Sequence, residues 1–315
     1  MRMRINEISH VVLTVAVIFG SVALLSAQTR DAGPKVFSSP EEAAKALVAA
    51  TELNNQAELT TILGSRAKDL VAQGNGLSDP DRRKKFFQMA KESLRVVPDP
   101  FKLNRFQIAV GNENWPVPLP IVKVKGGYRF DPVEAELEIL ARRIGTNELE
   151  AIEDLRDFAE AEREYAYYDL NENKTRDYAQ QIISTPGKHD GLFWEAKAGD
   201  AVCPLGKIVG RASAAGYSAP ANGEAPVYRG YVFRILKAQG PDASGGARDY
   251  LVRGSMLGGF ALIAYPAEYG VTGVKTFQVN HEGVVWEKDL GPRTKALAST
   301  MKRFNPDKMW HESPY

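Results

Sequence analysis

Cysteine is almost absent from this sequence of 315 residues, in which Cys203 stands alone. A single thiol cannot form a disulfide within the chain, so the stability of the fold must come from its hydrophobic cores. Net charge is also scarce, because 40 Lys and Arg residues stand against 39 Asp and Glu residues. This balance provides no field that attracts nucleic acid or anionic lipid, and we assign neither as a partner.

Motifs for nucleotide binding and for serine catalysis are missing as well. The Gly pairs at 126–127, 245–246 and 258–259 are not followed by a helix in the way a phosphate-binding loop requires, and we interpret them as turns. No Gly-x-Ser-x-Gly sequence is present either. The sequence therefore predicts no cofactor.

The N-terminus has the pattern of a secretory signal peptide. Arg2 and Arg4 precede an apolar run over residues 11–25, and Ser26 and Ala27 end it with small side chains. The run is shorter than the roughly 20 residues of a membrane-spanning helix. We expect cleavage after Ala27 and a periplasmic or secreted protein. The alternative is an uncleaved signal that anchors the chain to the inner membrane.

A linker over residues 28–37 is followed by a predicted N-terminal domain over residues 38–145. Ser39 and Pro40 are typical of a helix start, and apolar residues follow at helical spacing. Past Pro100 the apolar period changes from helical spacing to two, which indicates strands. Helices followed by strands predict an α+β domain with helices on a bent antiparallel sheet, similar to cystatin-like or NTF2-like architectures. The expected helices include 80–94, and the expected strands are 106–110, 117–124 and 128–130.

A second α+β domain is predicted over residues 146–315, in which a long helix packs on an antiparallel sheet. We expect a helix over residues 132–143 to end at Gly145 and Asn147 to cap the next one. A closing helix over 294–304 is expected to bury Leu297 and Met301. The expected strands of this domain are 228–236, 250–253, 260–265, 275–280 and 284–288, with a short helix over 205–215.

Four segments carry a likeness to a known family: 184–194 (STPGKHDGLFW), 230–240 (GYVFRILKAQG), 258–270 (GGFALIAYPAEYG) and 287–292 (EKDLGP), with weaker likeness at 115–116 and 139–149. Together they resemble a bacterial exported family known as domain of unknown function 2950. The resemblance covers nearly all of the chain after the predicted signal peptide. It implies export and brings no assigned reaction.

The C-terminal half has a long helix that reaches Tyr165, Gly-Tyr-Val-Phe and Ala-Tyr-Pro strands, and a turn and strand over 270–280. In these features it is similar, more loosely, to the globular heads of type IV pilin-like proteins. Pilins carry their long helix at the N-terminus, inside the membrane. Here the helix follows a folded domain and is charged on one face, which argues against polymerisation as a pilin.

One loop begins with the spacing of a calcium site. Asp169, Asn171 and Asn173 place side-chain oxygens at alternate positions. Lys174 then stands where a calcium loop has Gly, and Gln180 stands where it has a bidentate Glu. We interpret the loop as an Asn-rich turn and assign no metal.

The sequence contains two combinations of a nucleophile with a base, and neither has the features of a catalytic site. Cys203 with His189 lacks any local feature that would activate the thiol. Ser184, His189 and Asp190 are neighbours in one loop, where they cannot form the line of nucleophile, base and orienting acid. We assign no catalytic residue.

Aromatic residues provide the remaining candidates, because stacking on them can hold a glycan or a peptide. The candidate binding residues are Trp194, Trp286, Glu268 and Tyr269, of which the last two lie in a turn fixed by Pro266 and Gly270. Trp310 and Tyr265 belong to the same aromatic set. The alternative is that most of these rings are structural and lie in the hydrophobic core or at strand edges.

The sequence favours an exported envelope protein that is a non-catalytic binding or assembly module. Its expected partner is an unknown envelope protein or a glycan, with membrane contact only through an uncleaved signal segment. The alternative is a hydrolase acting on envelope material in a groove between the domains, in which Glu268, Asp190 or His189 would converge.

Overall fold

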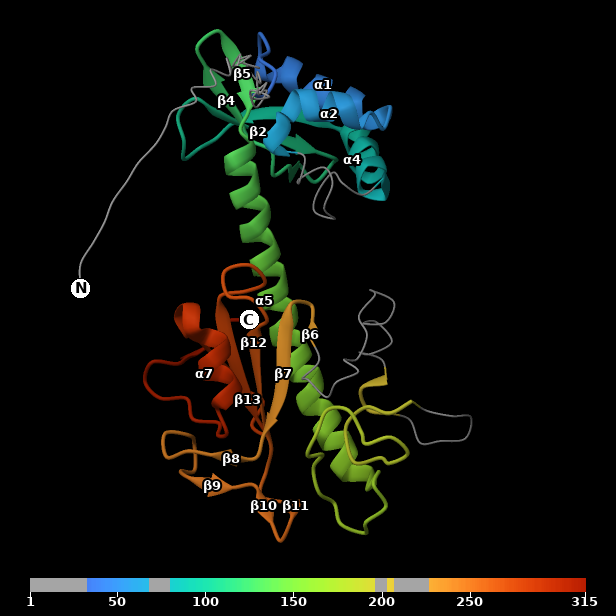
Figure 1. Ribbon diagram of the computed structural model, residues 1–315, viewed down its shortest axis with the longest axis vertical. Coiled ribbons are helices and arrows are strands. Elements are labelled where there is room, and N and C mark those ends of the chain that lie inside the picture. The colour runs from blue at the N-terminus through green and yellow to red at the C-terminus, as the bar shows by residue number, and fades with distance from the viewer. Residues whose placement is uncertain (1–32, 68–79, 196–202, 207–226) are drawn as a thin grey trace, which may run out of the picture.

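The structure is a computed structural model, and it describes residues 33–67, 80–195, 203–206 and 227–315. Two lobes lie at the two ends of one long helix, α5 (Pro132–Tyr168), so that the molecule resembles a dumbbell (Figure 1). Each lobe combines helices with antiparallel strands. The predicted α+β class is confirmed.

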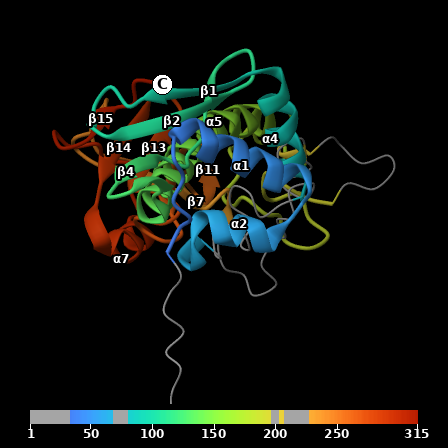
Figure 2. The same ribbon diagram turned by 90° about the horizontal axis from the view of Figure 1, so that it is seen from above.

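The N-terminal lobe begins with helices whose starts are set by local sequence. The Ser39 hydroxyl accepts a hydrogen bond from the Glu42 backbone N–H, which caps α1 (Pro40–Glu52) as predicted. The Asn55 side chain caps α2 (Gln56–Leu63) in the same way. A 3-10 turn, η1 (Ser65–Ala67), and α4 (Pro80–Glu92) complete the helical layer. Seen from above, α1 lies between α2 and the strands (Figure 2).

The sheet of this lobe has the strand order β1-β2-β4-β5, and β3 pairs with β2 at the side. Its hydrophobic core includes Leu47, Ile62, Ile108 and Phe130. The predicted helix over 80–94 ends two residues early, and Leu94 instead begins a strand that the sequence analysis missed. The strands are β1 (Leu94–Pro98), β2 (Arg105–Val110), β3 (Trp115–Pro116), β4 (Ile121–Val124) and β5 (Gly127–Phe130).

The predicted helix end at Gly145 is wrong, because α5 continues through it for another 23 residues. A glycine inside a helix costs only about 1 kcal/mol relative to Ala, which tertiary contacts can offset. Asn147 does not cap a helix; its amide donates to the backbone oxygen of Thr272 at 2.8 Å, and the neighbouring Glu148 carboxylate accepts from the N–H groups of Val274 and Lys275. These contacts hold the middle of α5 on the C-terminal lobe.

The C-terminal lobe is built on a six-stranded antiparallel sheet in the order β15-β14-β13-β12-β7-β6. All six residues of β12 are buried, because α5 and α7 both pack against it. Its strands are β6 (Val227–Tyr228), β7 (Tyr231–Leu236), β12 (Ala261–Pro266), β13 (Lys275–Asn280), β14 (Val285–Asp289) and β15 (His311–Glu312).

Two strands of this lobe differ from the sequence prediction. The strand expected over 228–236 is broken by a turn at Arg229 and Gly230, both of which have positive φ angles. The strand expected over 250–253 is not part of the main sheet. Its residues 251–252 form β10 (Leu251–Val252), which pairs with β11 (Ser255–Met256) in a small hairpin. A second small two-stranded sheet pairs β8 (Ala238–Gln239) with β9 (Arg248–Asp249).

The closing helix is shorter than predicted. A 3-10 turn, η2 (Gly291–Arg293), leads into α7 (Thr294–Thr300), which buries Thr294 and Ala298, while Leu297 is 40% exposed. The small Ala298 lets the helix approach the sheet closely, so the larger Leu297 points outward instead. The helix expected over 205–215 lies mostly outside the described residues.

Two hydrophobic cores lie on the two lobes and share no residue. The first ends along the chain at Ala135, with Ile139 packed against it, and the second begins at Ala151. We call the stretch of α5 between them, residues 140–150, the waist. The predicted domain boundary at 145/146 falls inside this waist.

Candidate functional site

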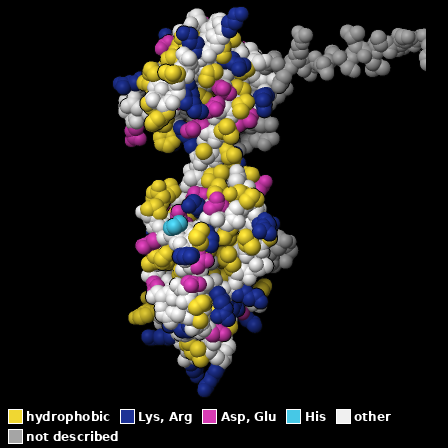
Figure 3. All heavy atoms as spheres, turned by 90° about the vertical axis from the view of Figure 1, so that its left-hand side faces the viewer, with side chains coloured by type: hydrophobic (Ala, Val, Ile, Leu, Met, Phe, Trp, Pro, Cys, Tyr) yellow, Lys and Arg dark blue, Asp and Glu magenta, His cyan; other side chains and the backbone are white. Residues whose placement is uncertain are grey.

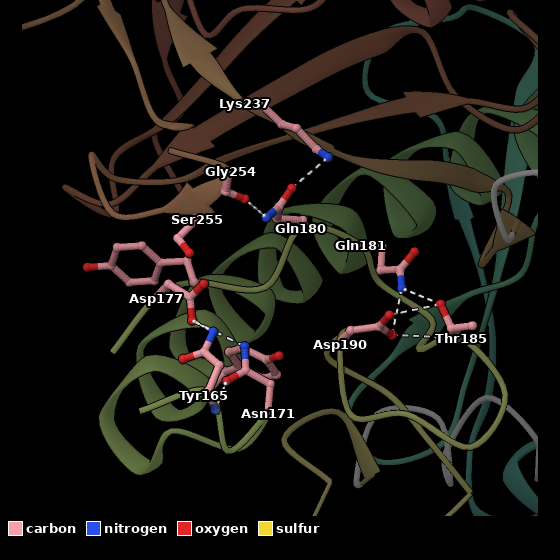
Figure 4. Close-up of a pocket in the computed structure, with 12 residues that line it drawn as sticks. Tyr165, Asn171, Asp177, Gln180, Gln181, Thr185, Asp190, Lys237, Gly254 and Ser255 are labelled. Atoms are coloured by element: carbon pink, nitrogen blue, oxygen red, sulfur yellow. Dashed lines mark hydrogen bonds between the residues drawn. The ribbon is translucent and has the colours of Figure 1, made fainter. Parts of the chain in front are cut away.

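A polar pocket of about 390 Å³ opens in the C-terminal lobe, beside the last turns of α5 (Figure 4). One wall is Tyr165 with the loop that follows the helix, and the opposite wall is Lys237 with the β10–β11 turn. Segments far apart in the chain therefore form one site. It is lined by Tyr165, Asn171, Asn173, Asp177, Tyr178, Gln180, Gln181, Thr185, Asp190, Lys237, Gly254 and Ser255.

The loop with the calcium-like spacing forms one edge of this pocket. The side-chain oxygens of Asp169, Asn171 and Asn173 accept hydrogen bonds from backbone N–H groups of the loop itself, at 2.7–3.2 Å. The amide groups of Asn171 and Asn173 both donate to one oxygen of Asp177. These side chains shape the loop around Asp177. Within the residues that the structure describes, no group of three or more His, Cys, Asp or Glu side chains is placed to hold a metal.

Asp190 is the most firmly held acid of the pocket. Its carboxylate accepts the backbone N–H and the hydroxyl of Thr185 at 2.8 and 2.9 Å, and the amide of Gln181 at 2.7 Å. Partial burial by itself raises the pKa of Asp190, but these hydrogen bonds together outweigh it and lower the pKa below its ordinary value. Asp190 is therefore an anion at neutral pH and serves as an acceptor rather than a general acid.

The opposite wall is joined to the loop through Gln180. Its amide nitrogen donates to the backbone oxygen of Gly254 at 2.7 Å, and its oxygen accepts from the Lys237 ammonium at 3.2 Å. Figure 4 shows both contacts at the rim of the pocket. Gln180 thus bridges the two walls of the pocket.

Two buried groups of α5 lie against the segments that line the site. The Tyr165 hydroxyl donates to the backbone oxygen of His189 at 2.6 Å, and burial raises its pKa well above the ordinary value. Glu162 is fully buried, and one of its oxygens accepts from the Ala179 N–H at 2.8 Å. Burial also raises the pKa of Glu162 well above its ordinary value. Both shifts favour the protonated, neutral forms of these groups, which pack against the loop.

The structure does not bring the four candidate binding residues together. Trp194 is 7% exposed and stacks on His189 with ring centroids 4.4 Å apart. Trp286 is half-buried on β14. Glu268 is exposed, and the Tyr269 hydroxyl donates to Asp289 at 3.3 Å. Tyr265 and Trp310, from the same aromatic set, are buried in the lobe.

Glu268 and Asp190 lie near opposite ends of the lobe. Glu268 is joined through Thr272 to Asn147 on α5, whereas the loop before Asp190 is joined through His189 to Tyr165. These two helix positions are separated by 18 residues, or about 27 Å at the rise of an α-helix. The three residues named for an interdomain hydrolase therefore do not converge.

The other pairings of nucleophile and base are not formed. Cys203 is buried and its thiol donates to the Leu192 oxygen at 3.3 Å, while burial raises its pKa. The Ser184 hydroxyl exchanges hydrogen bonds with the backbone of Gly191. Both groups therefore have structural roles in packing residues 184–195 and 203–206.

Several residues of the pocket escaped the sequence analysis, among them Gln181, Lys237 and Ser255, and Gln180 was considered only as a failed calcium ligand. The contacts of Gln180 span 57 and 74 residues of chain, so no local spacing reveals them. The one local signal was the density of Asn, Gln and Asp between residues 169 and 190, which we interpreted only as loop.

Fold and site together define an α+β protein of two lobes on one helix, with a polar pocket in the second lobe. The family model described as "Protein of unknown function (DUF2950)" matches residues 34–313, and the chain belongs to this family. No curated protein and no solved structure matches the chain. Among the described helices, none combines the length and the apolar character that a membrane crossing needs.

Proposed function

We propose that this protein is an exported, non-catalytic binding module that holds a neutral glycan of the cell envelope in the pocket beside Asp190. The observation that carries the proposal is the lining of that pocket, which is about 390 Å³ in volume and mostly polar. This volume falls in the range of small-molecule sites.

The side chains of the pocket match the chemistry of a sugar. Gln180, Gln181 and Asn173 each carry a donor and an acceptor in one plane, and Asp190 adds a fixed anionic acceptor. Neighbouring sugar hydroxyls are donors and acceptors in the same way. Two carboxylates, Asp177 and Asp190, stand against the single ammonium of Lys237, so a strongly anionic ligand is disfavoured.

The state of the acids favours binding over hydrolysis. A glycosidase needs one carboxyl that keeps its proton and a second that is ionised, both open to the substrate. Asp190 is held as an anion by three hydrogen bonds, and Asp177 accepts two amide groups. Burial favours the protonated form of Glu162, but this residue is fully buried and not open to a substrate. The hydrolase alternative therefore has no acid available in this pocket.

Export belongs to the proposal and rests on the sequence. Arg2 and Arg4, the apolar run over residues 11–25 and the small residues that follow have the order of a signal peptide. An exported chain meets the glycans of the envelope. The alternative partner, another envelope protein, predicts recognition of a surface rather than of a pocket.

Isothermal titration with a neutral oligosaccharide of β-1,4-linked N-acetylglucosamine tests the proposal. The Gln180→Ala change removes the side chain that bridges the two walls, and we expect affinity to fall about tenfold or more, which corresponds to about 1.4 kcal/mol. Gln56→Ala, at an exposed position of the N-terminal lobe, is the matched control and should bind as the unchanged protein does. Equal affinity of the two variants would contradict the assignment of this pocket.

A further inference from the structure

The described residues leave one face of α5 uncovered where the helix leaves the N-terminal lobe. Val133 and Leu137 are 42% and 58% exposed, and Leu140 and Ile144 are half-buried. The N-terminal lobe packs on the other face of the helix, through Ala135 and Ile139. Figure 3 shows hydrophobic side chains at the surface of the narrow part between the lobes. These four residues form what we call the α5 seam.

The spacing of the α5 seam is that of a coiled coil. Positions 133, 137, 140 and 144 are separated by four, three and four residues. On a helical wheel they fall within an arc of about 60°, at 100° per residue. Apolar side chains that alternate three and four apart are the knobs that one helix inserts between the side chains of a partner helix. The α5 seam therefore fits another helix better than it fits an irregular surface.

Charges beside the α5 seam select the kind of partner. Glu136 and Arg143 flank it on one side, seven residues apart, in the position that pairs across an antiparallel coiled coil. Other charged residues of this stretch already form ion pairs within the chain. Glu138 pairs with Arg142, and Glu134 pairs with Lys102 and Arg105. Glu136 and Arg143 have no ion pair within the part of the chain that the structure describes.

We propose that the α5 seam binds the same seam of a second copy of this chain, with the two helices antiparallel. In this arrangement Leu137 faces Leu140 of the second copy, and Val133 faces Ile144. The two-fold axis of this arrangement places Glu136 of each copy opposite Arg143 of the other copy, which gives two ion pairs. An interface of two-fold symmetry requires a surface that is complementary to itself, and this stretch is complementary in both shape and charge.

The first test is the mass of the intact protein, measured by sedimentation velocity as a function of concentration. We expect a mass of two chains at high concentration and dissociation on dilution. Leu137→Asp should give a single chain at every concentration. Leu149→Asp is the matched control, because Leu149 is 44% exposed on the opposite side of the helix, and this variant should still dimerise. A single chain in the unchanged protein, or a dimer that survives Leu137→Asp, would overturn the proposal.

Charge reversal separates pairing of the two helices from damage to the fold. Glu136→Arg and Arg143→Glu should each weaken the dimer about tenfold, since each places like charges across the axis. The double variant restores opposite charges and should regain the dimer of the unchanged chain. Failure of the double variant to recover would exclude the proposed register.

Introduced thiols test the direction of the helices, and buried Cys203 does not compete with them. A chain with Leu137→Cys is mixed with a chain with Leu140→Cys under oxidising conditions. Antiparallel helices should form the disulfide preferentially between position 137 of one chain and position 140 of the other. Preferential links between two like positions would instead show parallel helices and overturn the proposal.

Discussion

Glu162 on α5 lies beneath the backbone of Ala179, which donates a hydrogen bond to the carboxyl at 2.8 Å. The other oxygen of Glu162 is buried without a hydrogen-bond partner in the described structure. Ala179 stands between Tyr178 and Gln180, which both line the pocket. A fully buried carboxyl is therefore coupled through one hydrogen bond to the wall of the candidate site.

This contact predicts a particular dependence of stability on pH. Burial raises the pKa of Glu162 well above its ordinary value of 4.5, so the folded protein keeps a proton that the unfolded chain releases. The contribution of this group to the free energy of unfolding is full below pH 4.5 and is lost as the pH rises toward the folded pKa. The side chain of Glu162→Gln stays neutral at every pH. This variant should therefore have a melting temperature several degrees above that of the unchanged protein at pH 7, since each kcal/mol of regained unfolding free energy raises the melting temperature by about 2–4 °C.

Calorimetric melting of Glu162→Gln beside Glu164→Gln measures this effect, because Glu164 is exposed on the same helix. The gain of the first variant should shrink toward zero at pH 4, and the second should show no comparable gain. An identical pH profile for Glu162→Gln and the unchanged protein would exclude Glu162 as a buried neutral acid.

The two hydrophobic cores predict that the C-terminal lobe folds without the N-terminal one. A chain that begins at Thr146 keeps Asn147 and Glu148, whose side chains bind the turn around Thr272 and Val274. It also keeps every residue of the second core. We expect one cooperative melting transition by circular dichroism. A broad and non-cooperative melt would mean that the lobes depend on each other and that the boundary at 145/146 is misplaced.

The loop at Asp169 is expected not to gain stability from calcium. Its oxygens accept backbone N–H groups, and Asp169 is the one carboxylate among the three alternating positions. Saturating a native site at a hundred times its dissociation constant would add about 2.7 kcal/mol. The melting temperature should therefore be unchanged by calcium at millimolar concentration. A rise of several degrees that Asp169→Ala abolishes would show a calcium site.

The N-terminal sequence predicts removal of residues 1–27 during export. Expressed in a Gram-negative host, the protein should begin near Gln28 and be released by osmotic shock. Mass spectrometry of the released protein reads its first residue directly. Recovery of the intact chain from the membrane pellet would support the uncleaved anchor instead.

Local signals in the sequence predicted the elements that local contacts form. Ser39 caps α1 through a neighbour three residues away, and the alternation over 275–280 matches β13. The expected break at Gly145 was wrong because contacts from Asn147 and Glu148 reach residues 125 to 127 positions away. Such long-range contacts decide whether a helix continues through a residue of low helix propensity such as glycine. The spacing of residues near that position does not reveal them.

The pocket was hidden from the sequence for the same reason. The bonds among Gln181, Thr185 and Asp190 are local, and they fold one loop. Lys237 and Gly254 contact that loop through Gln180, which is 57 and 74 residues away from them along the chain. Sequence analysis instead selected aromatic residues for their type, and Trp194, Tyr265 and Trp310 are buried in the described structure.

The most direct test of the glycan site is to record the backbone amide signals of the protein by NMR while the neutral N-acetylglucosamine oligosaccharide is added. The proposed function predicts progressive shifts of the signals of Gln180, Gln181, Lys237 and Ser255, which line both walls of the pocket. Signals of the N-terminal lobe should stay in place. Shifts confined to other residues, or no shift at millimolar oligosaccharide, would contradict the account.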